Sequence, residues 1–273
     1  MKKILVIGEL ILDRFVYLDC NRLSPEACVP VGIPIKIEEN AGCAGNVVAN
    51  LQSLGQNLQI YLLRQPNIII KTRFLDSKYN HNFVRVDEND IISNSLTELD
   101  LQKFLTENNL TFKDLDVILF VDYNKGFLTQ NFIQKISEIC KICGILTFID
   151  TKKILGYWSK NITFVKINDK EYNYNFDITK DKIIDFCENL IVTLGKNGSK
   201  YISKEGKEEI IPTNEVKISN VAGAGDSYLA AFVIKYLETK SIIESMKFAN
   251  KVATFAVTQP GVIAVRLFDL NNN

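Results

Sequence analysis

The chain has 273 residues, 47% of them hydrophobic, so it is long enough to bury a large core without disulfides or a structural metal. Its 32 basic and 32 acidic side chains give a formal net charge of zero, which argues against a nucleic-acid partner. Acidic residues interrupt the apolar start of the chain, and no apolar run reaches the roughly 20 residues that span a bilayer. We therefore expect a cytoplasmic protein with no membrane partner.

Short apolar runs alternate with segments of helical periodicity along most of the chain. The predicted strands are residues 3–8, 57–63, 117–121, 145–149 and 190–194, and all but 57–63 are expected to be buried. The predicted helices are residues 44–54, 130–143, 225–237 and 241–257, and a hairpin is expected over residues 200–212. This order predicts an α/β fold with a mostly parallel central sheet between two helical layers, and ligands at the carboxyl ends of its strands.

Two segments do not follow this alternation. Residues 14–39 and 71–87 are polar, alternating and rich in β-branched side chains. We interpret them as a small β lid outside the main sheet, above the strand ends. The alternative is that they are ordinary surface hairpins.

The six cysteines do not indicate a disulfide framework in a chain of this length without a secretory leader. Cys140 and Cys143 form a CxxC pattern, but they share one helical face with Ile133 and Ile136. A zinc site would need a second pair of ligands, and the single histidine, His81, lies far away in the sequence. We therefore interpret the CxxC cysteines as packing residues.

The stretch "NVAGAGDS", residues 220–227, places two glycines and one aspartate at the start of an apolar helix. Gly223 and Gly225 leave backbone N–H groups uncovered at a helix amino terminus, where the helix dipole favours an anion such as phosphate. Asp226 beside that anion is a candidate base for an attacking hydroxyl. The alternative is that Asp226 is only a helix cap.

These residues resemble the carboxyl-terminal signature of the ribokinase (PfkB-type) sugar kinases. Further resemblances follow in the family's order: "IGELILDRF", "NAGCAGNVVANLQSLG", "KINDKEYN", "IVTLGKNGSKY" and "FANKVATFAVTQPGVIAV". Within the family, "LDRFVYLDCNRLSPEACVPV", "VDYNKGFLT" and "IDTKK" resemble the D-glycero-D-manno-heptose 7-phosphate kinases. The resemblance implies a ribokinase-like three-layer sandwich over residues 1–273 and a homodimer formed through the lid. We expect no separate nucleotidyltransferase half, because few residues follow the last kinase motif.

The implied reaction transfers the γ-phosphoryl group of ATP, with Mg²⁺, to the anomeric hydroxyl of a heptose 7-phosphate. The resemblance implies that Asp226 is the base. It also implies that the backbone of Gly223, Ala224 and Gly225 stabilises the negative charge that develops during transfer. The implied sugar-binding residues are Asp13, Arg14, Gly42, Asn46, Lys125 and Lys152. The implied nucleotide-binding residues are Thr193, Gly195, Asn250 and Gly261, and the metal would lie near Asn168 and Glu171.

The phosphate already present on such a substrate requires positive charge at its far end. The candidates are Arg14, Arg22, Lys71, Arg73, Arg85, Lys125 and Lys152. Arg14, Lys125 and Lys152 lie inside the matched motifs and are expected first, although any single one could be a solvated surface charge.

The sequence departs from the family pattern at several positions. Cys43 follows Gly42 where paired glycines are usual, so a side chain could crowd the sugar. Glu9 stands where this branch usually has Asp. Asn220 and Ala222 replace the usual Asp and Thr, which puts activation by a monovalent cation in doubt.

A helix and a strand that the family normally has after residue 63 are also absent, because "RQPNIII" leads directly into "KTRFL". We therefore expect one trimmed edge of the sheet. Two alternatives remain open: a kinase for another sugar or sugar phosphate, and a catalytically inactive sugar- or nucleotide-binding protein. A Rossmann dinucleotide enzyme is not expected, because "IGELILDRF" lacks G-x-G-x-x-G.

Overall fold

The computed structural model describes residues 1–79, 81–180 and 182–271. Its main sheet has eight strands in the order β12-β11-β10-β9-β8-β7-β1-β4. Strands β4, β1, β7, β8, β9 and β10 are parallel to one another. Strands β11 and β12 form the antiparallel hairpin predicted from the sequence. In sheet order from β4, the strands are Leu58–Leu63, Lys2–Gly8, Val117–Asp122, Leu146–Thr151, Phe164–Asn168, Asn189–Thr193, Ser199–Ser203 and Glu208–Ile211.

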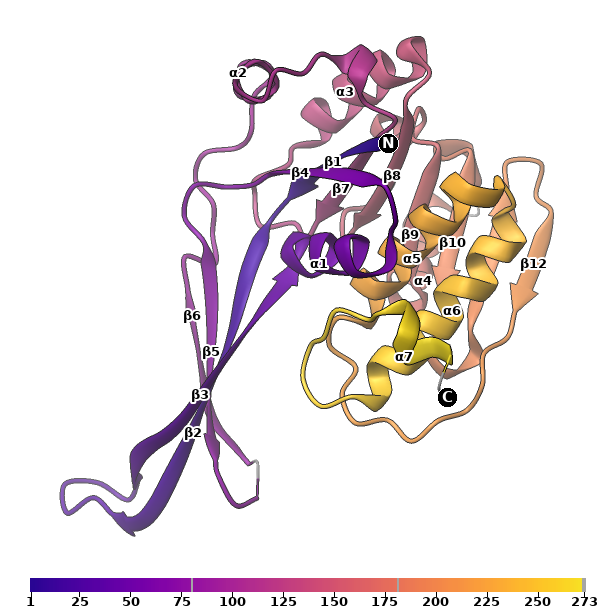
Figure 1. Cartoon of the computed structure of the whole chain (residues 1–273). Coiled ribbons are helices and arrows are strands. Elements are labelled where there is room, and N and C mark those ends of the chain that lie inside the picture. Colours follow the sequence, from indigo (N-terminus) through magenta and orange to yellow (C-terminus); the bar gives the residue numbers. More distant parts are fainter. Residues whose placement is uncertain (80, 181, 272–273) are drawn as a thin grey trace.

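Helices cover both faces of this sheet, as Figure 1 shows. One face packs against α1 (Ala44–Leu54), α5 (Ala224–Thr239) and α6 (Ile242–Thr258), and the other against α2 (Glu98–Glu107) and α3 (Gln130–Cys143). Along β1, Ile4 and Val6 belong to the first core whereas Leu5 and Ile7 belong to the second, because side chains alternate across a strand. The three-layer α/β prediction is therefore confirmed.

A second sheet of four strands projects from one end of the main sheet (Figure 1). In sheet order, it is formed by β3 (Pro30–Cys43), β2 (Leu10–Leu23), β5 (Ile69–Asp76) and β6 (Asn82–Glu88). Strand β2 continues from β1, and β5 follows β4 after only residues 64–68. The main sheet therefore ends at β4, as the short connection predicted.

Some elements lay outside the sequence prediction. Helix α2, strand β9 and helix α4 (Asp169–Thr179) were not predicted, and short α7 (Leu267–Asn271) closes the chain. Both predicted hairpin segments belong to the four-stranded sheet, which we call the lid. No helix in the described parts of the chain is long and apolar enough to cross a membrane.

Candidate functional site

The amino end of α5 lies between two pockets. Gly223 and Asp226 line a pocket beneath the lid, which we call the lid pocket. Ala224 and Gly225 line a second pocket against α6, which we call the α6 pocket. The backbone donors of this helix end therefore lie where molecules bound in the two pockets would meet.

Steric crowding explains why glycine occupies two positions at this helix end. Gly223 has φ of +79°, and a Cβ there would lie 2.6 Å from Asn46 Nδ2 and 2.8 Å from Val262 Cγ1. A Cβ on Gly225 would lie 2.9 Å from the ammonium of Lys166. The bare backbone thus allows a cation to approach the helix end, which adds to the positive potential there.

The Asp226 carboxyl is only 2% exposed and receives two hydrogen bonds. Tyr123 Oη donates to its Oδ1 at 2.9 Å, and Asn46 Nδ2 donates to its Oδ2 at 3.1 Å. Burial and the nearby Asp150 raise its pKa to about 6, against the opposing effects of Asn46, Lys166 and Tyr123. A carboxyl with this pKa is ionised at neutral pH yet basic enough to accept a proton.

A buried ion pair lies beside this carboxyl and was not predicted from the sequence. Lys166 on β9 contacts Asp150 on β8 at 2.5 Å, and their side chains are 7% and 12% exposed. Both residues interrupt apolar strands, and charges in such strands are the signal that could have identified them.

The lid pocket contains several of the predicted sugar-binding residues. Asp13, Gly42, Lys125 and Lys152 line it, together with the additional cations Lys71, Arg73 and Arg85. Four of these five cations are paired with acidic groups: Arg73 with Asp13, Arg85 with Asp87, Lys71 with Asp87 and Asp90, and Lys125 with Asp90. The pocket is thus strongly charged, with cations on the lid strands and on the loops after β7 and β8.

The structure does not bring two of the predicted residues to this pocket. Arg14 lies on the opposite face of the lid, because its neighbour Asp13 faces inward, and it pairs with Glu39 at 2.6 Å. Asn46 is buried beneath the pocket, where it contacts Asp226 and the Gly223 carbonyl.

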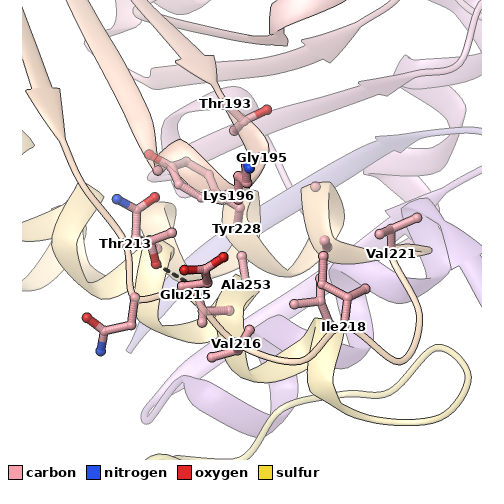
Figure 2. A pocket seen from close by; sticks show the side chains of 17 residues that line it. Thr193, Gly195, Lys196, Thr213, Glu215, Val216, Ile218, Val221, Tyr228 and Ala253 are labelled. Atoms are coloured by element: carbon pink, nitrogen blue, oxygen red, sulfur yellow. Dashed lines mark hydrogen bonds between the residues drawn. The ribbon is translucent and has the colours of Figure 1, made fainter.

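The α6 pocket lies beside the turn that follows β10, as Figure 2 shows. Thr193, Gly195 and Asn250, three of the residues predicted to bind the nucleotide, line it. Its other walls are largely apolar and include Val216, Ile218, Val221, Ala253 and Val257. Such a slot suits a flat heterocycle.

Two predicted nucleotide-side residues have different surroundings from those expected. The Asn250 amide donates to the Ile211 carbonyl at 2.9 Å and accepts from Ser199 at 3.0 Å, so its polar atoms join α6 to the sheet. Gly261 does not line the α6 pocket and lies near the Asn40 side chain instead.

Asn168 and Glu171 form the amino-terminal capping box of α4. Glu171 N donates to Asn168 Oδ1 at 2.9 Å, and Asn168 N donates to Glu171 Oε2 at 2.8 Å. Burial, with Asp150 adding a like charge, raises the pKa of Glu171. Among the residues described, no three acidic, cysteine or histidine side chains form a metal cluster. The side chains of Asn168 and Glu171 offer oxygen donors, the kind of ligand that Mg²⁺ takes together with phosphate and water.

Cys43 occupies a strained backbone position in the floor of the lid pocket. Its φ of 54° and ψ of −125° lie in a region that favours glycine, and it precedes α1 without capping it. Burial raises the pKa of its thiol well above the usual value, so it remains protonated.

We expect Cys43→Gly to raise the free energy of unfolding by about 1 kcal/mol, because relief of the strain exceeds the entropy cost of glycine. Cys43→Ala keeps the Cβ and the strain, so it should not stabilise the fold. Urea unfolding of the three proteins measures this. Equal stabilisation by alanine would show that the backbone is not the cause.

Comparisons with known proteins show the family and the fold. The sequence profile of the pfkB family carbohydrate kinases matches residues 72–267. A "Bifunctional protein HldE" of Campylobacter curvus is 30% identical over 95% of this chain, and one of a Nitratiruptor species is 29% identical over 98%. The chain spans 62% and 64% of the lengths of these two relatives. The structure of Arabidopsis thaliana ribokinase complexed with ribose and ATP superimposes with a TM-score of 0.72 at 14% identity, covering 99% of this chain and 98% of that one.

Proposed function

This chain belongs to the pfkB family of carbohydrate kinases, which are phosphotransferases with a sugar hydroxyl as acceptor, and we propose that it phosphorylates D-glycero-D-manno-heptose 7-phosphate. The donor would be ATP and the product the 1,7-bisphosphate. The proposal rests chiefly on Asp226, a buried carboxyl with a pKa of about 6 at the helix end between two pockets. The motifs that resemble the heptose 7-phosphate kinases support the heptose, and the ribokinase solved with ribose and ATP supports the donor.

The proposed step begins when a sugar hydroxyl in the lid pocket gives its proton to Asp226. Its oxygen then bonds to the γ-phosphorus of ATP while the bond to the β–γ bridging oxygen breaks, and ADP leaves. The N–H groups at the start of α5 and the Lys166 ammonium stabilise the charge on the transferring oxygens. Mg²⁺, near Asn168 and Glu171, would neutralise phosphate charge.

We assign the substrate's own phosphate to the lid end of the pocket. Lys71 and Lys125 converge there on Asp90, at 3.0 and 2.6 Å between ammonium and carboxylate. An incoming phosphate would replace the partly exposed Asp90 as the partner of these two ammonium groups. Arg14 is excluded from this role because it lies on the other face of the lid.

Lys125→Met is expected to raise KM for the sugar phosphate at least tenfold and to change kcat little, because it removes a contact made equally before and during transfer. Its effect on an unphosphorylated sugar should be less than twofold. Arg14→Met is the matched control on the opposite face. If Arg14→Met raised KM as much as Lys125→Met, the assignment of the phosphate would be wrong.

The lid also supports the proposal of a homodimer. Ile33, Ile35 and Ile37 alternate along the edge strand β3 and are 61–63% exposed. Ile37 also lines a groove with Val16 and Phe74 on the lid's outer face. A second lid would cover this apolar edge.

The wild-type protein is therefore expected to be a dimer and the Ile35→Lys variant a monomer. Light scattering measures the two molar masses. A wild-type protein that is monomeric at high concentration would contradict the homodimer.

We also place the reaction in a reducing compartment such as the cytoplasm, because all six cysteines are free thiols.

The second candidate function is a sugar- or nucleotide-binding protein without catalysis. One observation in its favour is Cys43, whose side chain lines the lid pocket. The other is that Asn220 and Ala222 replace the usual cation-site residues, and the Asn220 side chain accepts a hydrogen bond from the Ala222 N–H at 2.9 Å.

The two functions are separated by ADP release over a panel of D-glycero-D-manno-heptose 7-phosphate, sedoheptulose 7-phosphate, fructose 6-phosphate and ribose. We expect the heptose phosphate to have the highest kcat/KM. A preference for another sugar would change the substrate and keep the mechanism. No turnover together with retained ATP binding would favour the binding protein.

A further inference from the structure

Tyr123 is the one tyrosine whose hydroxyl is hydrogen-bonded to Asp226 in the described residues, and the mechanism above does not use it. The two donors to Asp226 come from different elements: Asn46 from α1, and Tyr123 from the turn after β7. Each carboxylate oxygen has one donor, and each has two acceptor sites. The plane of the carboxylate is thus held from two sides, and each oxygen keeps one acceptor site that can take a proton.

The backbone of Tyr123 is held by a fully buried carboxyl. Glu9 Oε2 accepts from the Tyr123 N–H at 2.9 Å, and Glu9 Oε1 accepts from the Lys125 N–H at 3.2 Å. Asn124 between them has φ of 57°, so the turn is sharply bent. Glu9 therefore clamps this turn and places the tyrosine ring.

The same ring supports a cation of the lid pocket. The Lys152 ammonium lies 4.2 Å from the centroid of the Tyr123 ring, within the range of a cation–π contact. Both side chains line the lid pocket beside Asp226. One residue thus contacts the base through its hydroxyl and a sugar-side cation through its ring face.

We infer that Tyr123 is a positioning residue that orients the Asp226 carboxylate toward the sugar hydroxyl and sets the pH above which this carboxylate acts as a base. The inference rests on the proposed function, because it assumes that Asp226 accepts the proton. It adds a role that neither the sequence motifs nor the pocket residues alone indicate.

The groups around Asp226 determine the direction of the effect. Its charged and titratable neighbours are Asp150 on β8, Lys166 on β9, Cys43 at the end of β3, and Tyr123. Burial raises the pKa of Tyr123 well above its usual value, so the hydroxyl stays protonated and is the donor. Donation to the carboxylate favours its ionised form, so loss of the hydroxyl must raise the pKa of Asp226.

The test is Tyr123→Phe, which removes the hydroxyl and keeps the ring beneath Lys152. The acid limb of the kcat/KM profile should move up by about one pH unit, because a hydrogen bond to a charged group is worth about that much. At pH 6, kcat should fall about fivefold, because the ionised fraction of Asp226 drops from about one half to about one tenth, while KM for the sugar stays within twofold. The matched control is Tyr201→Phe, whose hydroxyl donates to Asn189 at 2.7 Å, outside both pockets. A second variant, Tyr123→Leu, removes the ring as well and should also raise KM.

A readout without turnover separates this inference from the proposed function. The titration of ¹³C-labelled aspartate carboxyls is followed by NMR, and the Asp226→Asn protein identifies the Asp226 signal. Movement of that titration to higher pH in Tyr123→Phe supports the role even if every sugar fails as a substrate. An unchanged titration and an unchanged rate profile overturn it, and so does a change in KM alone, which would make Tyr123 only a sugar contact.

Discussion

Asp226→Asn is expected to reduce kcat by about a thousandfold while making the protein more stable at pH 8. The rate falls because no group remains to take the proton from the sugar hydroxyl, and loss of a general base costs about 10²–10⁴-fold. ATP binding should persist, since the α6 pocket is lined by other residues. ADP release and nucleotide titration measure the two effects.

The gain in stability follows from the sign of the pKa shift. A carboxyl whose pKa is raised from 3.8 to about 6 on folding favours the folded state only while protonated. This contribution is complete below the unfolded pKa and is lost as the pH rises through about 6. Above that pH the buried charge opposes folding by about 2–3 kcal/mol, which an uncharged asparagine relieves in part. A variant that is inactive but less stable at pH 8 would contradict this account of the base.

Lys166→Met is expected to have the second largest effect, on stability and on rate together. It leaves Asp150 in a largely buried place without its partner, and breaking such a pair costs about 3–5 kcal/mol. It also removes the cation beside Gly225, so kcat/KM should fall about 10²- to 10³-fold. The remaining Asp150 charge would raise the pKa of Asp226 further.

Two controls separate these effects. Asp150→Asn combined with Lys166→Met should restore much of the stability, but not the rate. Lys141→Met breaks an exposed pair with Glu188 and should cost less than about 1 kcal/mol. If the double variant recovered full activity, Lys166 would only be neutralising Asp150.

Much of the fold could be predicted because its signals are local. Apolar runs such as residues 117–121 mark strands buried on both faces, and the stretch 220–227 marks a helix start beside a charged site. The five-residue link after β4 also predicted the trimmed edge of the sheet, since no crossover helix fits in it.

The site was harder to predict because the direction of a side chain is not local. Arg14 lies inside a matched motif, yet the period of two along β2 turns it away when Asp13 faces the pocket. Asn46 stands in the expected helical turn, but only the packing of α1 against α5 shows that its amide contacts Asp226. Glu9 and Tyr123 meet because two parallel strands end at the same edge, although 114 residues separate them.

The reaction proposed for this site transfers a phosphoryl group from ATP to a hydroxyl held beside Asp226. The most direct measurement is ³¹P NMR of D-glycero-D-manno-heptose 7-phosphate incubated with ATP, Mg²⁺ and the protein, with Asp226→Asn alongside. We predict a new phosphate on the anomeric carbon, formed together with ADP by the wild-type protein and not by the variant. Unchanged sugar in the presence of bound ATP, or a product made equally well by Asp226→Asn, would contradict it.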